Sequence, residues 1–211
     1  PRNAGKAGKT ALIFSREMTR HQLVLRVLCA EDMVDSHADR TGRINDGDRA
    51  RLVESSNSVA RCNIYINDMS SGIFDIIAMT KREYAIRPVD LVCIDYLQLI
   101  QTNVRDMNRD REIGFITGRL KSMAKELNIP VLCLSQLSRI NEMGKTKEPT
   151  LNALRDSGNI EQDADTVMFL HSDDYYNRET DEGEQLQTWL TKLIIAKQRN
   201  GPTEYVNMTF E

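Results

Sequence analysis

The sequence predicts an α/β fold: a parallel β-sheet flanked by helices, with an antiparallel hairpin at the C-terminus. Short apolar runs alternate with segments whose apolar residues recur at helical spacing. One run, "VDLVCIDYLQLI" at 89–100, is too continuously apolar for an edge strand and suits a strand buried on both faces. The last two runs are separated by Asn200-Gly201-Pro202, which is typical of a turn.

Composition limits what the fold can be. The chain has 211 residues, of which 40% are hydrophobic, and this is enough for the core of one domain or of two small ones. No apolar run approaches the roughly 20 residues that cross a bilayer, and no charged-then-apolar leader opens the chain, so we expect a soluble protein with no membrane partner. The net charge of −3 excludes a uniformly basic surface but not a local basic groove. Four widely spaced cysteines without a CxxC pair indicate reduced thiols and a cytoplasmic location.

The first elements follow from short patterns. "ALIF" at 11–14 is a short apolar run that predicts a strand, and Thr19 and Gln22 have the Thr-x-x-Gln spacing of a capping box that begins a helix. "CNIYIND" at 62–68 alternates like a strand, and the isoleucines from Ile73 onward predict the next helix.

The centre of the chain repeats the alternation. After the strand at 89–100, a long amphipathic helix is predicted from Arg109, and "IPVLCLSQ" at 129–136 is predicted as another buried strand. The apolar positions of that helix are Ile113, Ile116, Leu120, Met123 and Leu127. Strands separated by helices indicate a parallel sheet. Further strands are expected at 165–171, 189–201 and 203–210, the last two forming a hairpin that closes the sheet.

The stretch "GKAGKT" at 5–10 ends like a phosphate-binding loop. Such a loop follows a strand and begins a helix directly after its lysine, because both the loop N–H groups and the helix dipole face the phosphates. Here Asn3 occupies the first required glycine position, and the residues after Thr10 resemble a strand. We therefore favour a flexible turn that leads into the first strand, although a phosphate site remains the alternative.

Seven motifs resemble, in order, the C-terminal motor domain of DnaB-type replicative DNA helicases, which has a RecA-like fold. They are "FSREM" (14–18), "LCAED" (28–32), "IDYLQLI" (94–100), "LSQLSR" (134–139), "LRDSGNIEQDAD" (154–165), "DDYYN" (173–177) and "IIAKQRNGP" (194–202). Recombinases and circadian-clock ATPases of the same class fit the motifs less well.

The resemblance implies an ATP- and Mg²⁺-dependent helicase. It implies a homo-hexameric ring that moves 5′ to 3′ on single-stranded DNA and whose full-length form meets a primase and a helicase loader. In that family the phosphate loop precedes the strand resembling "ALIF", so residues 1–211 form a motor domain without its phosphate-loop strand and helix and without the N-terminal domain. The alternative is a non-catalytic ring subunit or partner-binding module.

Three polar residues follow predicted strands. Asp95, at the carboxyl end of a buried strand, suits Mg²⁺ beside a nucleotide, because α/β sheets bind ligands at that edge. By resemblance, Glu17 is the catalytic glutamate that polarises the attacking water, and Gln136, at the end of the next strand, is the sensor of the γ-phosphate. The alternative for Asp95 and Gln136 is ordinary polarity at a strand end, and for Glu17 it is a solvated carboxylate ahead of a helix cap.

Two further groups take their roles from the resemblance. Lys197 and Arg199, two positions apart on a strand, point to one face and are expected to reach the γ-phosphate bound by the neighbouring subunit. Surface charge is their alternative. Within "LRDSGNIEQ" the resemblance gives a DNA-binding loop, in which Arg155 pairs with phosphate, Asp156 orders the loop and Gly158 lets the DNA backbone come close. The usual residue at position 156 in the family is Glu. Tyr175 or Tyr176 is expected to stack on the nucleotide base, with core packing as the alternative.

Overall fold

The computed structural model describes residues 1–34, 44–70, 72–102, 104, 107–137, 148–172 and 189–210. The chain divides into two units, the first formed by 1–105 with 119–136 and the second by 106–118 with 137–211. The long helix α6 (Arg109–Leu127) contributes residues 109–118 to the second unit and residues 119–127 to the first.

The first unit contains a four-stranded parallel sheet in the order β2-β1-β3-β4. Its elements besides α6 are α1 (Arg2–Lys6), β1 (Ala11–Ser15), α2 (Arg20–Asp32), α4 (Asp46–Ala60), β2 (Ile64–Asn67), α5 (Ile73–Ile86), β3 (Leu91–Asp95), the 3₁₀ helix η1 (Leu97–Leu99) and β4 (Val131–Cys133). Ala11 lies in register with both Ile64 and Leu91, so β1 is paired on both sides. The predicted parallel sheet is confirmed.

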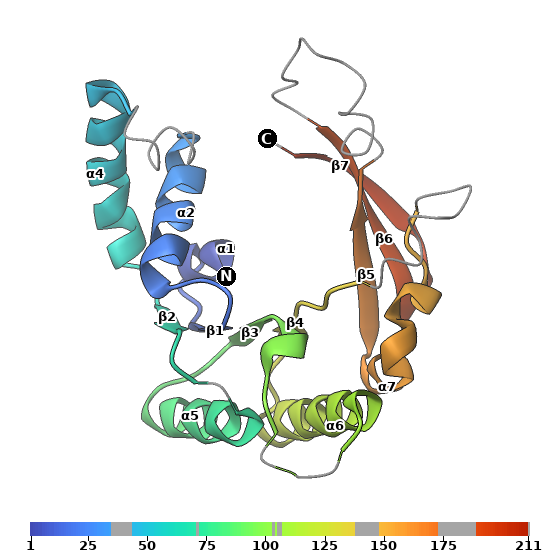
Figure 1. Ribbon diagram of the computed structural model, residues 1–211. Coiled ribbons are helices and arrows are strands. Elements are labelled where there is room, and N and C mark those ends of the chain that lie inside the picture. The colour runs from blue at the N-terminus through green and yellow to red at the C-terminus, as the bar shows by residue number, and fades with distance from the viewer. Residues whose placement is uncertain are drawn as a thin grey trace. The chain divides into compact units, whose positions relative to one another are not determined.

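Helices cover both faces of this sheet. Figure 1 shows α5 on one side of the strands, with α1, α2 and α4 on the other. The buried residues of α5 include Ile73 and Ile76, which are 0% and 1% exposed, as its apolar spacing predicts. At Gly5 a side chain would meet Cys62 Cβ and Ile64 Cγ1 at 2.9 Å, so α1 lies directly against the β2 end of the sheet.

The N-terminus of α2 was predicted from the sequence, whereas that of α4 was not. The capping box predicted before α2 is confirmed, since Thr19 accepts from the Gln22 N–H and the Gln22 side chain accepts from the Thr19 N–H. Helix α4 is not predicted. Its polar sequence has little apolar periodicity, and it even buries a serine, Ser55. The cap at Asn45, whose side chain accepts from the Asp48 N–H at 2.8 Å, was the available signal.

The stretch "GKAGKT" forms a helix end and a turn. Helix α1 ends at Lys6, Gly8 adopts the left-handed region at φ +75°, and β1 begins at Ala11. Lys9 Nζ lies 3.0 Å from Asp90 Oδ1, and the Thr10 N–H donates to Asp90 Oδ2 at 2.9 Å. A strand, not a helix, follows the lysine, which confirms the turn predicted from the sequence.

The prediction of a buried strand at 129–136 is wrong in two respects. Strand β4 covers only Val131–Cys133, and it lies at the edge of the described sheet. Leu132 and Leu134 are 40% and 51% exposed. Their apolar character, read alone, does not distinguish an edge from the centre.

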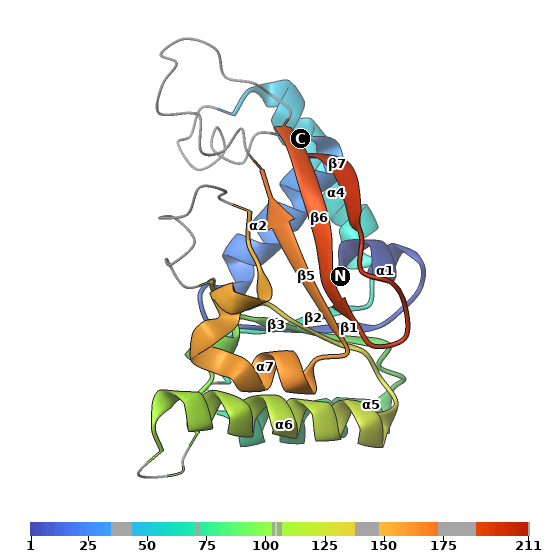
Figure 2. The ribbon, with the colours of Figure 1, turned by 90° about the vertical axis from the view of Figure 1, so that its right-hand side faces the viewer.

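The second unit contains an antiparallel sheet in the order β5-β6-β7 (Figure 2). Its elements besides α6 are the 3₁₀ helix η3 (Leu151–Ser157), α7 (Gly158–Asp163), β5 (Thr166–His171), β6 (Trp189–Gln198) and β7 (Tyr205–Phe210). The predicted hairpin is confirmed as β6 and β7. It does not close the parallel sheet, because β5 and the hairpin pair with each other in a separate sheet whose core is Leu154, Val167 and Phe169.

The segment expected to be a DNA-binding loop is largely helical. Residues 151–157 form η3, with Leu154 outside helical dihedrals, and α7 follows directly from Gly158. Gly158 has φ −49° and ψ −24°, so its backbone is ordinary right-handed helix. The segment is therefore helical where the sequence predicted a loop, with Leu154 in the small core, and its role in DNA binding stays a prediction.

Candidate functional site

Glu17 lies in a turn that is held on both sides. The turn follows β1, as predicted, and the Glu17 side chain is exposed. The Arg16 N–H donates to the Asp95 carbonyl oxygen at 2.9 Å, and the Met18 N–H donates to Ser15 Oγ at 3.2 Å. Ser15 is 1% exposed, so its hydroxyl is a fixed acceptor inside the unit. The backbone on each side of Glu17 is therefore fixed to the ends of β1 and β3.

The start of α2 is anchored to the end of β2. Asp68 Oδ2 accepts from the Arg20 N–H at 2.9 Å. This hydrogen bond is the main reason that the pKa of Asp68 lies below its usual value. A carboxylate at a helix N-terminus also complements the helix dipole.

Asp95 is the last residue of β3, as predicted, and lies in register with Ser15. Asp95 is half-buried. Burial raises the pKa of the Cys133 thiol to about 12, and the charge of Asp95 adds to the shift. The Cys133 thiol therefore stays protonated at neutral pH and offers no thiolate to a metal or a substrate.

The oxygen donors at this edge fit magnesium beside a phosphate. Across the described ranges, no group of three or more His, Cys, Asp or Glu side chains is gathered to hold a metal ion. Mg²⁺ usually takes one or two protein carboxylates together with water and phosphate oxygens, and it prefers oxygen to sulfur. Asp95 alone matches that requirement, and the protonated Cys133 thiol does not compete with it.

Gln136 lies beyond its strand, because β4 ends at Cys133. The prediction that it ends the strand is wrong, but its backbone is hydrogen-bonded to the side chain of Gln98. The Gln136 N–H donates to Gln98 Oε1 at 3.1 Å, and Gln98 Nε2 donates to the Gln136 carbonyl oxygen at 3.2 Å. Asp95 thus ends β3, while Glu17 and Gln136 follow β1 and β4, and all three lie at the carboxyl edge of one parallel sheet.

Lys197 and Arg199 meet at the end of α7 in the second unit. Lys197 is in β6, whereas Arg199 follows its last residue, so the pair is only partly on a strand. Lys197 Nζ donates to the carbonyl oxygens of Glu161 and Ala164, the latter at 2.9 Å. Arg199 donates to the Gln162 carbonyl oxygen at 3.1 Å, and its Nη1 lies 3.1 Å from Asp165 Oδ1. The two charged groups therefore lie near each other, and the partners that the structure gives them belong to this chain.

The predicted DNA segment is fixed at its helical end. Asn159 Nδ2 donates to the Asp110 carbonyl oxygen at 3.2 Å, and Thr117 Oγ1 donates to Asp163. A side chain at Gly114 would meet Asn159 Nδ2 at 2.5 Å, so Asn159 lies over that glycine of α6. Arg155 and Asp156 belong to η3, and a Cβ at Gly158 would meet no heavy atom within 4 Å.

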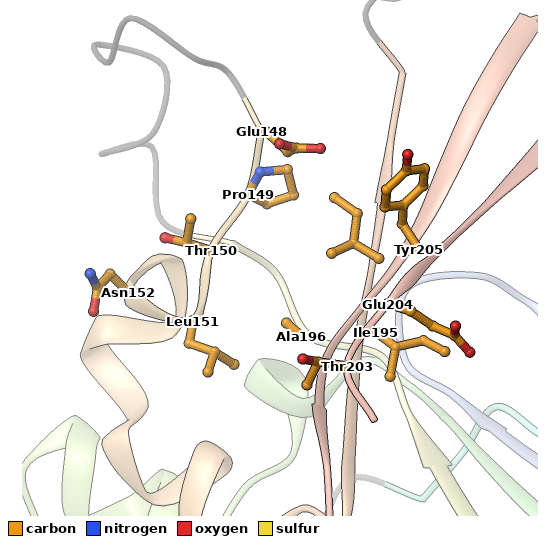
Figure 3. Close-up of a pocket in the computed structure, with 11 residues that line it drawn as sticks. Glu148, Pro149, Thr150, Leu151, Asn152, Ile195, Ala196, Thr203, Glu204 and Tyr205 are labelled. Carbon is orange, nitrogen blue, oxygen red and sulfur yellow. The ribbon is translucent and has the colours of Figure 1, made fainter. Parts of the chain in front are cut away.

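A solvent-open groove of about 570 Å³ lies in the second unit (Figure 3). It runs between 148–152 and the β6–β7 hairpin, with Leu151, Ile194 and Tyr205 among its lining residues. None of its lining residues is a predicted site residue.

Tyr175, which was predicted to stack on the nucleotide base, lies outside the described residues. In the parts of the chain that the structure describes, no helix has the length and hydrophobicity to span a bilayer.

Sequence reasoning missed Ser15, Asp68 and Gln98, which hold the backbone around the predicted site. Each is a small or amide-bearing polar residue near a strand end, which is a common and uninformative pattern. The signal for Gln98 was its place inside "IDYLQLI", but that motif says nothing of what the glutamine contacts.

The chain is similar to replicative helicases over nearly its whole length. The family described as "DnaB-like helicase C terminal domain" matches residues 2–211. "Replicative DNA helicase DnaB" of Geobacillus stearothermophilus is 42% identical over 209 residues, which cover 98% of this chain and 45% of that protein. "Replicative DNA helicase DnaC" of Bacillus subtilis (strain 168) has the same identity and coverage. The chain thus spans less than half the length of these relatives.

Solved structures agree with the fold. One structure, described as an "ATPase Domain", superposes with a TM-score of 0.88 at 31% identity, covering 98% of this chain and 72% of that one. "The Structure Of A DnaB-Like Replicative Helicase And Its Interactions With Primase" gives 0.88 at 32% identity, with 98% and 49% coverage. The predicted fold class is confirmed.

Proposed function

The chain belongs to the DnaB-like helicase C-terminal domain family, and we propose that it is the ATP-hydrolysing motor domain of a replicative DNA helicase. The motor works as a hexameric ring that moves on single-stranded DNA and unwinds the duplex at the replication fork. The observation that carries the proposal is that Glu17, Asp95 and Gln136 lie at or just beyond the carboxyl ends of three strands of one parallel sheet. In open α/β sheets, ligands bind at the carboxyl ends of the strands.

Each of these residues has a distinct task. Asp95 would hold Mg²⁺, directly or through its water shell, because Mg²⁺ takes carboxylate oxygens and this half-buried carboxylate ends a strand of the sheet. Glu17 accepts a proton from the attacking water, and its exposed side chain on a fixed turn is free to approach it. Gln136 donates its amide N–H to a phosphate oxygen. Bound Mg·ATP supplies the phosphoryl group and the charge that these residues act on.

The phosphate loop is proposed to come from coding sequence upstream of Pro1. The stretch "GKAGKT" is a turn after α1, and β1 follows it, which is opposite to the strand-loop-helix order that phosphate binding requires. The chain also spans only 45% of the curated relatives. We call this sequence together with that upstream sequence the extended chain.

DNA binding is assigned to the segment that ends in α7. Arg155 would pair with a backbone phosphate, Asp156 would help to order the DNA-binding loop, and the open space at Gly158 would admit the DNA backbone. Phosphate contacts carry no base information, which suits a motor that moves along any sequence. Asn159 and Asp163 support the assignment, since they fix the helical end of the segment to α6.

Lys197 and Arg199 are proposed to act on the γ-phosphate bound by the neighbouring subunit. Cations placed there stabilise the charge that grows in the transition state. Their present partners are main-chain carbonyls and one carboxylate of α7 and the residues after it, so they would leave these to reach a phosphate. Tyr175 is proposed to stack on the base.

The partners and location are also proposals. One structural relative is described in terms of its interactions with primase, and we propose primase and a helicase loader as partners of the full-length protein in the cytoplasm. The second candidate is a non-catalytic ring subunit or partner-binding module. The turn conformation of "GKAGKT" favours it for the chain as it stands.

The test is nucleotide binding and hydrolysis by both chains. Isothermal titration with Mg·ATP should give weak binding for the 211-residue chain and micromolar or tighter binding for the extended chain. The extended chain should hydrolyse ATP, with a rate that rises on addition of single-stranded DNA. Sub-micromolar binding by the 211-residue chain would return the phosphate site to "GKAGKT". If the extended chain assembles into rings but neither binds nor hydrolyses ATP, the proposed motor function is wrong and the non-catalytic ring subunit or partner-binding module is favoured.

A further inference from the structure

The side chain of Gln98 joins the ends of two neighbouring strands. Gln98 belongs to η1, three residues after Asp95, and is half-buried. Its Oε1 accepts from the Gln136 N–H at 3.1 Å, and its Nε2 donates to the Gln136 carbonyl oxygen at 3.2 Å and to Ser135 Oγ at 3.0 Å. One carboxamide thus satisfies both backbone groups of Gln136.

These contacts continue the pairing of β3 with β4 beyond the strands. The backbone ladder ends with the Leu134 N–H donating to the Ile94 carbonyl oxygen and the Leu97 N–H donating to the Leu134 carbonyl oxygen, both at 2.9 Å. The next residue to be paired on the β4 side is Gln136, two positions on. There the Gln98 carboxamide takes the place of a peptide group, because it presents a donor and an acceptor in the same plane.

We propose that Gln98 is a positioning residue that fixes the sensor Gln136 relative to Asp95. The inference rests on the proposed function, in which the Gln136 side chain meets the γ-phosphate. Holding both the N–H and the carbonyl of a residue fixes its peptide planes and so the direction in which its side chain leaves the backbone. Because Gln98 lies in η1, three residues after Asp95, its contacts join the backbone of the sensor to the segment that carries the metal-binding carboxylate.

The chemistry requires glutamine. Glutamate has the same shape and keeps an acceptor for the Gln136 N–H, but it has no donor and sets an anionic oxygen against the Gln136 carbonyl. Methionine keeps the length and removes all three hydrogen bonds. Gln101, three residues on, is exposed and provides a matched control for the change of charge.

The first test is steady-state ATP hydrolysis by the extended chain. Gln98→Glu should lower kcat about tenfold or more while KM for ATP changes less than about twofold, because the sensor acts on the transition state. Gln101→Glu should keep the wild-type kcat. The kcat of Gln98→Met should fall between those of Gln98→Glu and Gln101→Glu. Methionine loses the hydrogen bonds, which water can replace, but it does not place a negative charge against the Gln136 carbonyl.

A double-mutant cycle separates positioning from a general structural role. If Gln98 acts through Gln136, the variant carrying both Gln98→Glu and Gln136→Ala should be no slower than Gln136→Ala alone. Ring assembly and the thermal midpoint are measured for each variant. Independent, multiplying losses in the double variant would overturn the proposal, as would a Gln98→Glu kcat equal to that of Gln101→Glu.

Hydrogen exchange gives a readout that needs no catalysis. In the extended chain, Gln98→Met should speed exchange of the Gln136 amide at least about threefold, while the Leu134 amide, held by the Ile94 carbonyl, keeps its rate. The rates are measured by mass spectrometry with fragmentation that resolves single amides. Unchanged exchange at Gln136 would contradict the inference. If the wild-type extended chain fails to hydrolyse ATP while the Gln136 amide responds to Gln98→Met, the proposed function fails and the positioning contact stands.

Discussion

Lys197 Nζ donates to the main-chain carbonyl oxygen of Ala164 at 2.9 Å, and the same ammonium group donates to the carbonyl of Glu161. Carbonyls at a helix C-terminus have no partner within the helix, and a cation placed there also meets the negative end of the helix dipole. Lys197 therefore caps the C-terminus of α7, and this contact does not depend on the role proposed for Lys197 at a neighbouring subunit.

Replacing Lys197 should destabilise the second unit. Lys197→Met removes two charge-assisted hydrogen bonds, and we expect the free energy of unfolding to fall by about 1–2 kcal/mol. Lys192→Met, on the same strand, is the matched control. Its ammonium lies 3.5 Å from an exposed Glu148, so we expect a loss below about 0.5 kcal/mol. Urea unfolding followed by circular dichroism measures both, and equal losses would argue against the cap.

Arg199 provides the test of action between subunits. In the extended chain, Arg199→Ala rings should lose about 10³-fold in ATPase rate. Mixing them with subunits defective in phosphate binding should restore activity, because some interfaces then pair an intact arginine with an intact nucleotide site. ATPase rate is measured against mixing ratio, with assembly checked by sedimentation. Normal hydrolysis by Arg199→Ala rings would leave Arg199 as a capping residue only.

Substitutions at two glycines of α6 distinguish the effect of packing against α7 from the effect of helix propensity. Gly114→Ala puts a methyl group 2.5 Å from Asn159 Nδ2, whereas at Gly118 the nearest atom is Asp163 Oδ2 at 4.0 Å. Alanine favours helix by about 1 kcal/mol over glycine, so Gly118→Ala should stabilise the chain. Gly114→Ala should displace Asn159, cancel that gain and weaken binding of a fluorescent single-stranded oligonucleotide by the extended chain. If the two variants bind the oligonucleotide with equal affinity, the proposed role of α7 in DNA binding is contradicted.

The two carboxylates of the first unit should fail in different ways. In the extended chain, Glu17→Gln should abolish turnover and leave Mg·ATP binding intact, because only the proton acceptor is lost. Asp95→Asn should weaken Mg²⁺-dependent binding as well. Exposed Glu54, on α4, supplies the control variant Glu54→Gln, which should keep both. Near-wild-type turnover by Glu17→Gln would remove its catalytic assignment.

The anchor at Asp68 should make stability depend on acid pH. Its pKa lies below the ordinary value of 3.8, chiefly because of the Arg20 N–H. A pKa lowered by folding contributes stability that is complete well above 3.8 and is lost as the pH falls through the folded value. Asp68→Asn keeps an acceptor but no charge. The gap in thermal midpoint between wild type and Asp68→Asn should be largest at about pH 7 and close towards about pH 3, and a gap that widens on acidification would refute the anchor.

Local patterns predicted most elements of the first unit. The capping box at Thr19, the alternation at 62–68 and the helical spacing from Arg109 each involve residues close in sequence, and each is confirmed. Pairing between distant segments was not predictable in this way. Nothing in "IPVLCLSQ" indicates that β4 lies at the edge of the described sheet, and nothing in "DTVMFLH" indicates that β5 pairs with β6 in a sheet of its own.

The candidate site shows the same division. Glu17 and Asp95 were found because they lie just beyond and at the carboxyl ends of strands that are visible in the sequence. Gln98 was missed because its partner is a backbone 38 positions away, and a side chain that binds backbone leaves no complementary residue to look for. The capping of α7 by Lys197 was hidden for the same reason.

The pairing order of β1 has a consequence for synthesis of the chain. β1 is buried along its whole length, yet both of its neighbours, β2 and β3, are translated after it. During synthesis its apolar residues therefore leave the ribosome without a partner, which is a condition that favours mispairing and recruits chaperones. The β6–β7 hairpin closes a short turn and forms quickly once translated, whereas the parallel sheet waits for distant segments to meet. Slower translation through 15–63 would lengthen the time for which β1 is vulnerable.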